Sequence, residues 1–228
     1  MPQIKTSNLT FLKDLRKNNN RDWFTENKKR YQGEHAEIAT FAEALLTKMN
    51  EHDVIETPSG KKSLYRIYRD VRFSKDKSPY KTHWAGGFKR ATAARRGGYF
   101  FHIQPGDQSF IAGGFWAPNK EDLLRIREEI STDASELRKI LADPTFVKMF
   151  KELGGEQLKT APKGFDKEDP NIDLLRYKQF IFGRNITDEE VLSPDFLDTV
   201  NDTFKAMRPF FDYMSDVLTT DSNGESIL

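Results

Sequence analysis

The sequence predicts one α+β domain, with a long N-terminal helix and several C-terminal helices packed on an antiparallel β-meander. Three observations support this fold class: a long apolar stripe at helical spacing near the N-terminus, three short aromatic-rich runs between glycine turns, and helical stripes that resume after Pro118. Because the three aromatic-rich runs follow one another directly, an antiparallel meander is favoured over a parallel sheet. We expect a single domain over residues 1–228, with a frayed tail at 219–228.

The N-terminal region predicts two helices. The first covers residues 7–17, and the run Asn18-Asn19-Asn20 ends it. Asn20 then suits the N-cap of a long helix that reaches about residue 50, with Asp22 in the first turn, where the helix dipole favours an anion. One apolar stripe runs along this helix, formed by Phe24, Tyr31, Ile38, Phe41, Leu45 and Met49.

The segment after the long helix is ambiguous. Residues 53–60 read as a turn region. Residues 64–73 fit both a helical and a strand pattern, and their aromatic and β-branched content slightly favours a strand. Residues 74–82 contain Pro79 and are expected to form a loop or a single turn.

The middle of the chain has a clearer β pattern. Three strands are expected at 84–89, 98–104 and 109–116, and the triplet Pro105-Gly106-Asp107 suits a hairpin turn between the last two. Alternation along the second strand places Phe100 and His102 on one face, where they can meet Phe110 or Trp116 of the next strand. A filled core is the stronger interpretation for these aromatic residues.

The C-terminal half is mainly helical. Apolar spacing predicts helices near 123–130, 135–141 and 146–153, an irregular loop at 158–170, a short helix from 174 and a further strand at 180–182. Ser193 as N-cap and Pro194 at the first position predict one last helix, and Pro209 is expected to kink it. Its apolar stripe consists of Leu197, Val200, Phe204, Met207, Phe211, Met214 and Leu218.

Charge is sorted along the chain although the formal net charge is only +1. Residues 61–96 hold 12 Lys and Arg against 2 Asp, a net of +10, whereas residues 185–228 hold 10 Asp and Glu against 2 basic residues, a net of −8. The chain has no cysteine, which excludes disulfides and cysteine nucleophiles. No signal peptide or transmembrane run is evident, so we expect a cytoplasmic protein without a membrane partner.

Candidate chemistry is densest between residues 66 and 83. Arginine forks bind phosphate or carboxylate through paired hydrogen bonds, hydroxyl groups complete such a shell, and histidine and aspartate can carry protons. Arg66, Arg69, Arg72, Ser74, Lys75, Tyr80, Lys81 and Thr82 are therefore candidate ligand-binding residues, and Asp70 and His83 are candidate catalytic residues. The structural alternative is equally open at this point: the arginines pair with Asp70 and Asp76, or the acidic C-terminal helix covers the basic stretch.

Familiar site motifs are absent. The chain lacks nucleotide-binding glycine loops, the serine-hydrolase elbow and the zinc-protease helix motif. The four histidines have no ligand spacing, so neither a metal site nor a cofactor is predicted. His102 joins the candidate ligand-binding residues because His83 and His102 would flank the arginine cluster if they lay on neighbouring strands.

Several motifs together resemble one family, the domain of unknown function 2461, which occurs in bacteria and fungi. The resemblance covers about residues 6–218 and implies one continuous domain, but it implies no activity, substrate or catalytic residue. The motifs that carry it are Asn18-Asn19-Asn20-Arg21-x-Trp23-Phe24, Arg66-Ile67-Tyr68-Arg69-Asp70-Val71-Arg72-Phe73-Ser74-x-Asp76-Lys77-x-Pro79-Tyr80-Lys81-Thr82-His83, Gly98-Tyr99-Phe100-Phe101-His102-Ile103, Ala112-Gly113-Gly114-x-Trp116, Pro162-x-Gly164-Phe165 and Leu192-Ser193-Pro194.

Three functions remain in play. The first, which we favour, is a binding or catalytic pocket for an anionic small molecule, phosphorylated or otherwise charged, at residues 66–83. The second is a nucleic-acid-binding module that uses the basic stretch 61–96 and its aromatic residues, although a pI near 7.8 is low for such proteins. The third is a structural or protein-interaction role, in which the acidic C-terminal helix meets a basic surface on a partner or a second copy. The sequence does not decide between enzyme and binding protein.

Overall fold

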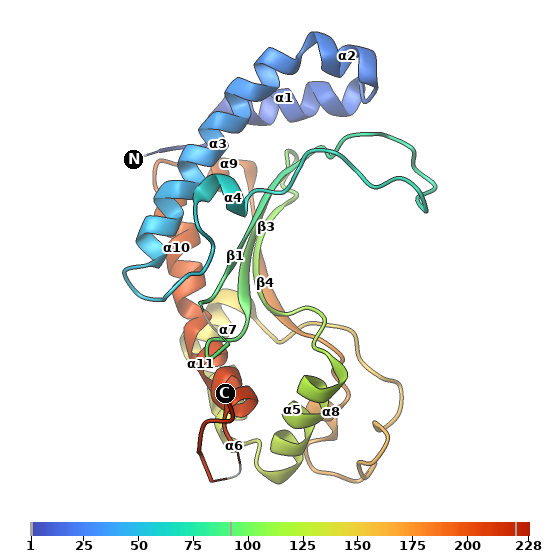
Figure 1. Cartoon of the computed structure of the whole chain (residues 1–228), viewed down its shortest axis with the longest axis vertical. Coiled ribbons are helices and arrows are strands. Elements are labelled where there is room, and N and C mark those ends of the chain that lie inside the picture. Colours follow the sequence, from blue (N-terminus) through green and yellow to red (C-terminus); the bar gives the residue numbers. More distant parts are fainter. Residues whose placement is uncertain (1, 92, 222) are drawn as a thin grey trace. The chain divides into compact units, whose positions relative to one another are not determined.

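The structure is a computed structural model that describes residues 2–91, 93–221 and 223–228 (Figure 1). None of the helices in these ranges has the length and apolar character that a membrane span requires. The elements follow in the order α1 (Thr6–Lys17), α2 (Arg21–Glu26), α3 (Lys28–Met49), α4 (Gly60–Ser63), β1 (Trp84–Lys89), β2 (Gly98–Ile103), β3 (Ser109–Phe115), α5 (Lys120–Thr132), α6 (Ser135–Ala142), α7 (Pro144–Phe150), α8 (Ile172–Leu175), β4 (Phe180–Ile186), α9 (Asp188–Leu192), α10 (Phe196–Ala206) and α11 (Arg208–Thr219).

The sheet confirms the predicted α+β meander. In the described part of the chain it has four antiparallel strands in the order β1-β2-β3-β4. The turn between β2 and β3 contains Gly106 at φ 90° and Asp107 at φ 59°. Glycine enters this left-handed region without steric cost and aspartate tolerates it, so the Pro-Gly-Asp triplet closes the predicted hairpin.

Contacts divide the chain into two compact units. Unit 1 holds the residues up to Phe88, together with Phe100–Ile111 and Asn185–Asp202. Unit 2 holds Lys89–Tyr99, Ala112–Arg184 and the residues from Thr203 onward.

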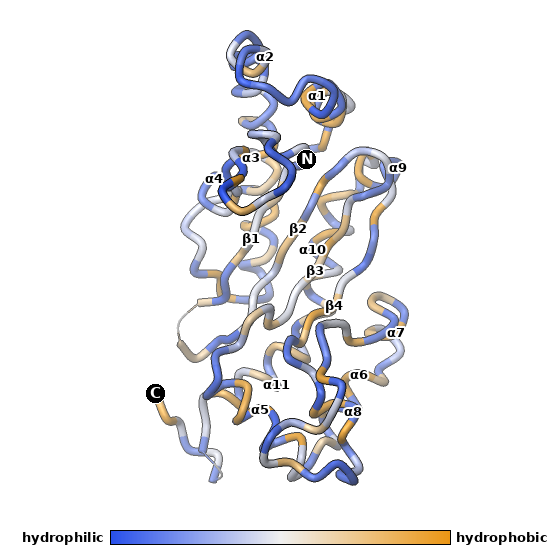
Figure 2. Tube along the Cα trace, turned by 90° about the vertical axis from the view of Figure 1, so that its right-hand side faces the viewer, coloured by the Kyte–Doolittle hydropathy of each residue, from blue (hydrophilic) through white to orange (hydrophobic). Residues whose placement is uncertain are grey.

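Unit 1 is built around the apolar stripe of α3. Ile38, Phe41, Leu45 and Met49 are fully buried, and the ring of Phe41 lies 6.1 Å from that of Phe101 and 5.5 Å from that of Phe196. The predicted long helix is interrupted at Asn27, whose side-chain Nδ2 donates to the carbonyl of Trp23, and this interruption separates α2 from α3. The predicted cap is confirmed, since Asn20 Oδ1 accepts a hydrogen bond from the amide of Trp23. In Figure 2, α1 carries both hydrophobic and hydrophilic residues, and Leu9, Phe11, Leu12 and Leu15 are its buried apolar side chains.

Unit 2 has its own aromatic core against α11. Phe210 and Phe211 contact the rings of Phe115 and Phe182 at centroid separations of 4.9–6.3 Å, and Tyr99 meets Phe211 edge-on at 5.0 Å. Large aromatic side chains of this kind supply much of the apolar area that a fold buries.

The prediction of a single kinked C-terminal helix was wrong. The structure has two helices there, α10 and α11, with the break at Met207 and Pro209 in the first turn of α11. Proline has no amide hydrogen and clashes with the preceding turn, so a new helix start accommodates it better than a helix interior. The predicted start, with Ser193 as N-cap and Pro194 at the first position, was also wrong. Ser193 is the C-cap of α9, its hydroxyl accepts from the amide of Asp195 in the turn that follows, and α10 begins at Phe196.

The strand at residues 64–73 was also wrong. These residues and the loop that follows form an extended excursion, here called the arm (residues 64–83), which is the teal loop between α4 and β1 in Figure 1. Two isolated antiparallel bridges hold it, Leu64 with Gly86 and Tyr68 with Tyr80. Pro79 accepts a hydrogen bond from the amide of Arg69 at 2.9 Å but has no amide to return one, which limits the ladder to single bridges.

Candidate functional site

A surface pocket of about 430 Å³ lies in unit 1 at the root of the arm. Its volume is in the range of small-molecule sites. We call it the arm pocket. It is lined by Arg16 from α1, Asn19 from the turn after α1, and Arg69, Asp76, Ser78, Tyr80, Lys81, Thr82 and His83 from the arm.

The turn after α1 fastens the root of the arm. Asn19 makes a reciprocal pair of hydrogen bonds with the backbone of Tyr80: its Nδ2 donates to the carbonyl at 2.9 Å, and its Oδ1 accepts from the amide at 3.1 Å. The ring of Tyr80 stacks on Phe24 with the centroids 4.0 Å apart. The Asn18-Asn19-Asn20 run therefore does more than end a helix, because it joins segments 61 residues apart.

The arm pocket gathers three cationic side chains and one carboxylate. Arg69 forms an ion pair with Asp76, which also accepts from the amide of Ser78 at 2.9 Å. These hydrogen bonds, first from Ser78 and then from Arg69, lower the pKa of Asp76 and keep it ionised. Among the described residues, no carboxylate lies within ion-pair distance of Arg16 or Lys81. The pocket is therefore cationic after its internal pair is formed.

Lys81, like Arg69, is half-buried, whereas Arg16 is exposed. Burial lowers the pKa of Lys81, and the neighbouring charge of Arg66 lowers it further. Its Nζ lies 5.6 Å from the ring centre of Tyr65, in a cation–π arrangement. An anion in the pocket would offset both the burial of the ammonium group and its repulsion by Arg66.

The structure brings His83 and His102 together. His83 directly precedes β1, His102 lies on β2, and their ring centroids are 4.2 Å apart. Burial lowers the pKa of His83 to about 4, with smaller contributions from His102, Lys81 and Arg69. Burial also lowers the pKa of His102, whose Nε2 lies 3.0 Å from Oε1 of Gln104. Both imidazoles are thus uncharged near pH 7, so His83 offers the pocket a proton acceptor.

The remaining candidate residues lie outside the arm pocket. In residues 70–73 of the arm, here called the arm tip, Arg72 donates two parallel hydrogen bonds to Asp70. They run from Nε to Oδ1 at 3.0 Å and from Nη2 to Oδ2 at 2.6 Å, and they lower the pKa of Asp70. Arg66 and Lys75 are exposed and Ser74 is half-buried, and none of the three lines the pocket. The structure therefore brings together Arg69, Tyr80, Lys81 and His83, with His102 beside His83.

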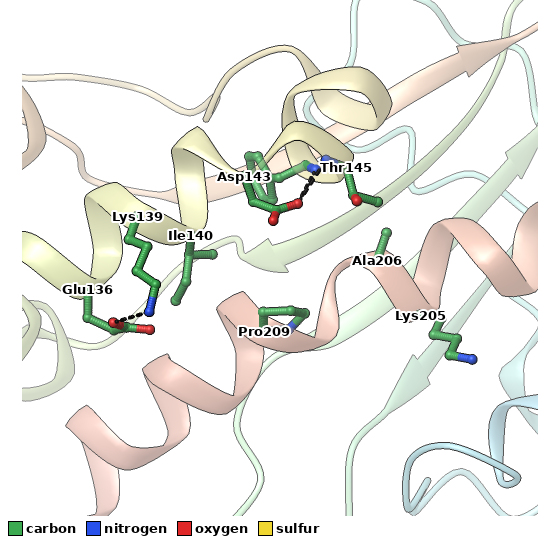
Figure 3. A pocket seen from close by; sticks show the side chains of 9 residues that line it. Glu136, Lys139, Ile140, Asp143, Thr145, Lys205, Ala206 and Pro209 are labelled. Atoms are coloured by element: carbon green, nitrogen blue, oxygen red, sulfur yellow. Dashed lines mark hydrogen bonds and ion pairs between the residues drawn. The ribbon is translucent and has the colours of Figure 1, made fainter.

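A second pocket lies in unit 2, and its acidic side chains are already engaged by neighbouring groups (Figure 3). It lies among α6, α7 and the α10–α11 junction. Glu136 pairs with Lys139 at 3.4 Å, and Asp143 accepts from the amide of Thr145 at 2.8 Å as the cap of α7. No cluster of three or more metal-binding side chains occurs among the residues that the structure describes.

Comparisons with known proteins give one finding. Residues 7–213 match the model of a family described as conserved hypothetical protein, DUF2461. Neither the curated proteins nor the solved structures contain a match to this chain. Because the family match spans most of the chain, the protein belongs to the DUF2461 family of conserved hypothetical proteins.

Proposed function

We propose that the protein binds an anionic small molecule, with a phosphate as its charged group, in the arm pocket. The observation that carries this proposal is the pair of cations, Arg16 and Lys81, which have no carboxylate partner among the described residues and line one concavity with Arg69. Exposed cations on a convex surface are usually solvated and cost little. Cations gathered in a pocket repel one another, and an anion relieves that repulsion.

The hydrogen-bonding groups of the pocket suit phosphate. Guanidinium forks donate two parallel hydrogen bonds to phosphate oxygens, and an ammonium group adds a point charge. Thr82, which carries a hydroxyl group, also lines the pocket. His83, uncharged near pH 7, is the group that would accept a proton if a reaction follows binding.

Thermal unfolding in inorganic phosphate tests the proposal. A ligand that binds only the native state raises the melting temperature. At matched ionic strength, phosphate is expected to raise the melting temperature of the wild type above its value in chloride. The variants R69A and K81A should lose most of that increase.

The matched control is K62A, which removes an exposed lysine of the same basic stretch outside the pocket. It should retain the full phosphate effect. Equal increases in the wild type, R69A and K81A would refute binding in the arm pocket.

A second candidate, single-stranded nucleic acid, is favoured by one observation at the arm tip. Phe73 is 96% exposed, and the guanidinium of Arg72 lies 5.9 Å from its ring centre. Exposed aromatic rings beside cations bind bases by stacking and phosphates by charge. Fluorescence anisotropy with a labelled oligonucleotide tests this candidate: binding that F73A abolishes supports it, and the absence of salt-sensitive binding excludes it.

A further inference from the structure

One face of β2 and β3 in unit 1 carries aromatic side chains that remain partly open to solvent. On β2, Phe101 and Ile103 are at most 1% exposed and form the core face. Phe100 and His102, which alternate with them, are only half-buried, as is Phe110 on β3. The two faces of this part of the sheet therefore differ in burial although both are aromatic.

These half-buried rings form a continuous row. The centroids of His102 and Phe110 lie 4.7 Å apart with the planes 15° from parallel, and Phe100 lies 5.6 Å from Phe110. Tyr65 of the arm, 53% exposed, extends the row at 5.9 Å from Phe100. We call Tyr65, Phe100, His102 and Phe110 the aromatic platform.

The aromatic platform adjoins the arm pocket at two places. His83 lines the pocket, and its ring lies 4.2 Å from that of the platform residue His102. Lys81 also lines the pocket, and its Nζ lies 5.6 Å from the ring centre of Tyr65. A ligand held in the pocket by its anionic group would therefore have aromatic surface beside it.

Polar amides lie at the His102 end of the platform. Gln104 accepts a hydrogen bond from His102 through Oε1, and its Nε2 donates to Oε1 of Gln108. Amide side chains present both a donor and an acceptor, the combination that recognises the edge of a heterocyclic base.

We propose that the ligand of the arm pocket is a nucleoside monophosphate, with its phosphate among Arg16, Arg69 and Lys81 and its base stacked on the aromatic platform. This inference rests on the proposed function, because it assigns the rest of the molecule whose phosphate the pocket holds. A mononucleotide fits better than a nucleic-acid strand because the cations converge in one pocket, whereas a strand requires cations spaced along its backbone.

Calorimetric titration with a graded set of ligands tests the inference. The probes are inorganic phosphate, ribose 5-phosphate, and the four common nucleoside monophosphates, all at fixed ionic strength. At least one nucleotide is expected to bind about tenfold more tightly than ribose 5-phosphate, because stacking of a base on an aromatic side chain contributes at that scale.

Two variants separate the base from the phosphate. F110L removes a platform ring and should reduce nucleotide affinity to that of ribose 5-phosphate, while ribose 5-phosphate itself binds as before. R69A should weaken both ligands. Y65L provides the same test at an exposed position, and it decides the outcome if F110L does not fold, which a circular dichroism melt would show.

The failures are distinguishable. If ribose 5-phosphate and every nucleotide bind equally to the wild type, the base site is wrong while the phosphate pocket stands. If neither phosphate nor any of its esters binds, the proposed function fails as well. Tight binding of an oligothymidylate that F110L abolishes, without measurable binding of any mononucleotide, would overturn the inference in favour of single-stranded nucleic acid.

Discussion

Arginines from the same basic stretch lie in opposite surroundings in the two units. In unit 2, Arg90 is 1% exposed, and its guanidinium donates to Asp212, to Ser215 Oγ at 3.2 Å and to the carbonyl of Arg96 at 3.1 Å. In unit 1, Arg69 is only half-buried, and its pair with Asp76 leaves Arg16 and Lys81 beside it without a carboxylate among the described residues.

Residues of one basic stretch in the sequence therefore do not form one basic surface in the structure. The acidic C-terminal region supplies Asp212 on α11, which neutralises Arg90, and α5 supplies Asp122 for Arg96. The arm has only the local acids Asp70 and Asp76 to offset its cations. Part of the sequence charge is thus cancelled inside the fold, and the remainder is left for a ligand.

The largest expected effect on stability comes from removing the buried guanidinium of Arg90. R90M keeps most of the apolar stem and removes the cation, so the Arg96 carbonyl loses a donor, while Asp212 keeps that of Arg208 and Ser215 keeps the amide of Arg96. Because Asp212 is 49% exposed, the cost is expected below that of a fully buried pair, at about 2 kcal/mol. Chemical denaturation should show a loss of unfolding free energy of that size, and K62A should show almost none. A loss below about 0.5 kcal/mol would contradict the structural role of Arg90.

Removing Arg69 in the arm pocket should have the opposite effect: it should weaken ligand binding and change the stability little. R69A is expected to weaken phosphate binding about tenfold, equivalent to about 1.4 kcal/mol, because a charge-assisted hydrogen-bond donor is lost. Its unfolding free energy should change by less than about 1 kcal/mol, since its partner Asp76 is largely solvated. Titration calorimetry and denaturation of the same sample measure both quantities. Lost stability with unchanged affinity would place Arg69 with Arg90 as a structural residue.

The pH dependence of stability tests the lowered pKa of His83. Its pKa in the folded protein is about 4, below the ordinary value of 6.5, so the unfolded chain binds more protons between these values. The free energy of unfolding should therefore fall as the pH drops from about 6.5 to 4, with a slope of at most about one proton. H83Q should flatten this slope, leaving the part due to His102 and His35, whose pKa values burial lowers in the same direction. An unchanged slope would show that His83 titrates normally.

The smallest effect is expected at the arm tip. F73A removes a ring that is 96% exposed, so it should change the unfolding free energy by less than about 0.5 kcal/mol and leave phosphate binding unaltered. A denaturation curve together with a phosphate titration checks both statements. A marked loss of phosphate affinity would mean that the arm pocket and the arm tip act together.

Much of the fold could be predicted from sequence because it depends on local periodicity. The stripe of α3, the three central strands and the Pro-Gly-Asp turn were all evident in the order of the residues. The arm was misread because its backbone pairs through two isolated bridges with residues that a local pattern does not reveal. The division of α10 from α11 followed from Pro209, whose presence was noted but whose effect was underestimated.

The candidate site was predicted only in part. The density of charged residues indicated Arg69, Tyr80, Lys81 and His83, which line one pocket. Alternation allowed His102 to meet Phe110 or Trp116, and the structure shows the contact with Phe110. Arg16 and Asn19 were missed because they come from the N-terminal helix and its turn, far away in sequence. The reciprocal hydrogen bonds between Asn19 and Tyr80 exist only in three dimensions.

In the arm pocket, Arg16 and Lys81 have no carboxylate partner among the described residues and can hold an anion beside Arg69, whereas Arg90 and Arg96 of unit 2 are paired with Asp212 and Asp122. A crystal soaked in sodium selenate, with an anomalous difference map at the selenium edge, tests this difference most directly. A peak is expected within hydrogen-bonding distance of Arg69 and Lys81, and none at Arg90 or Arg96. An empty arm pocket at high selenate concentration, with peaks at other surface cations, would contradict it.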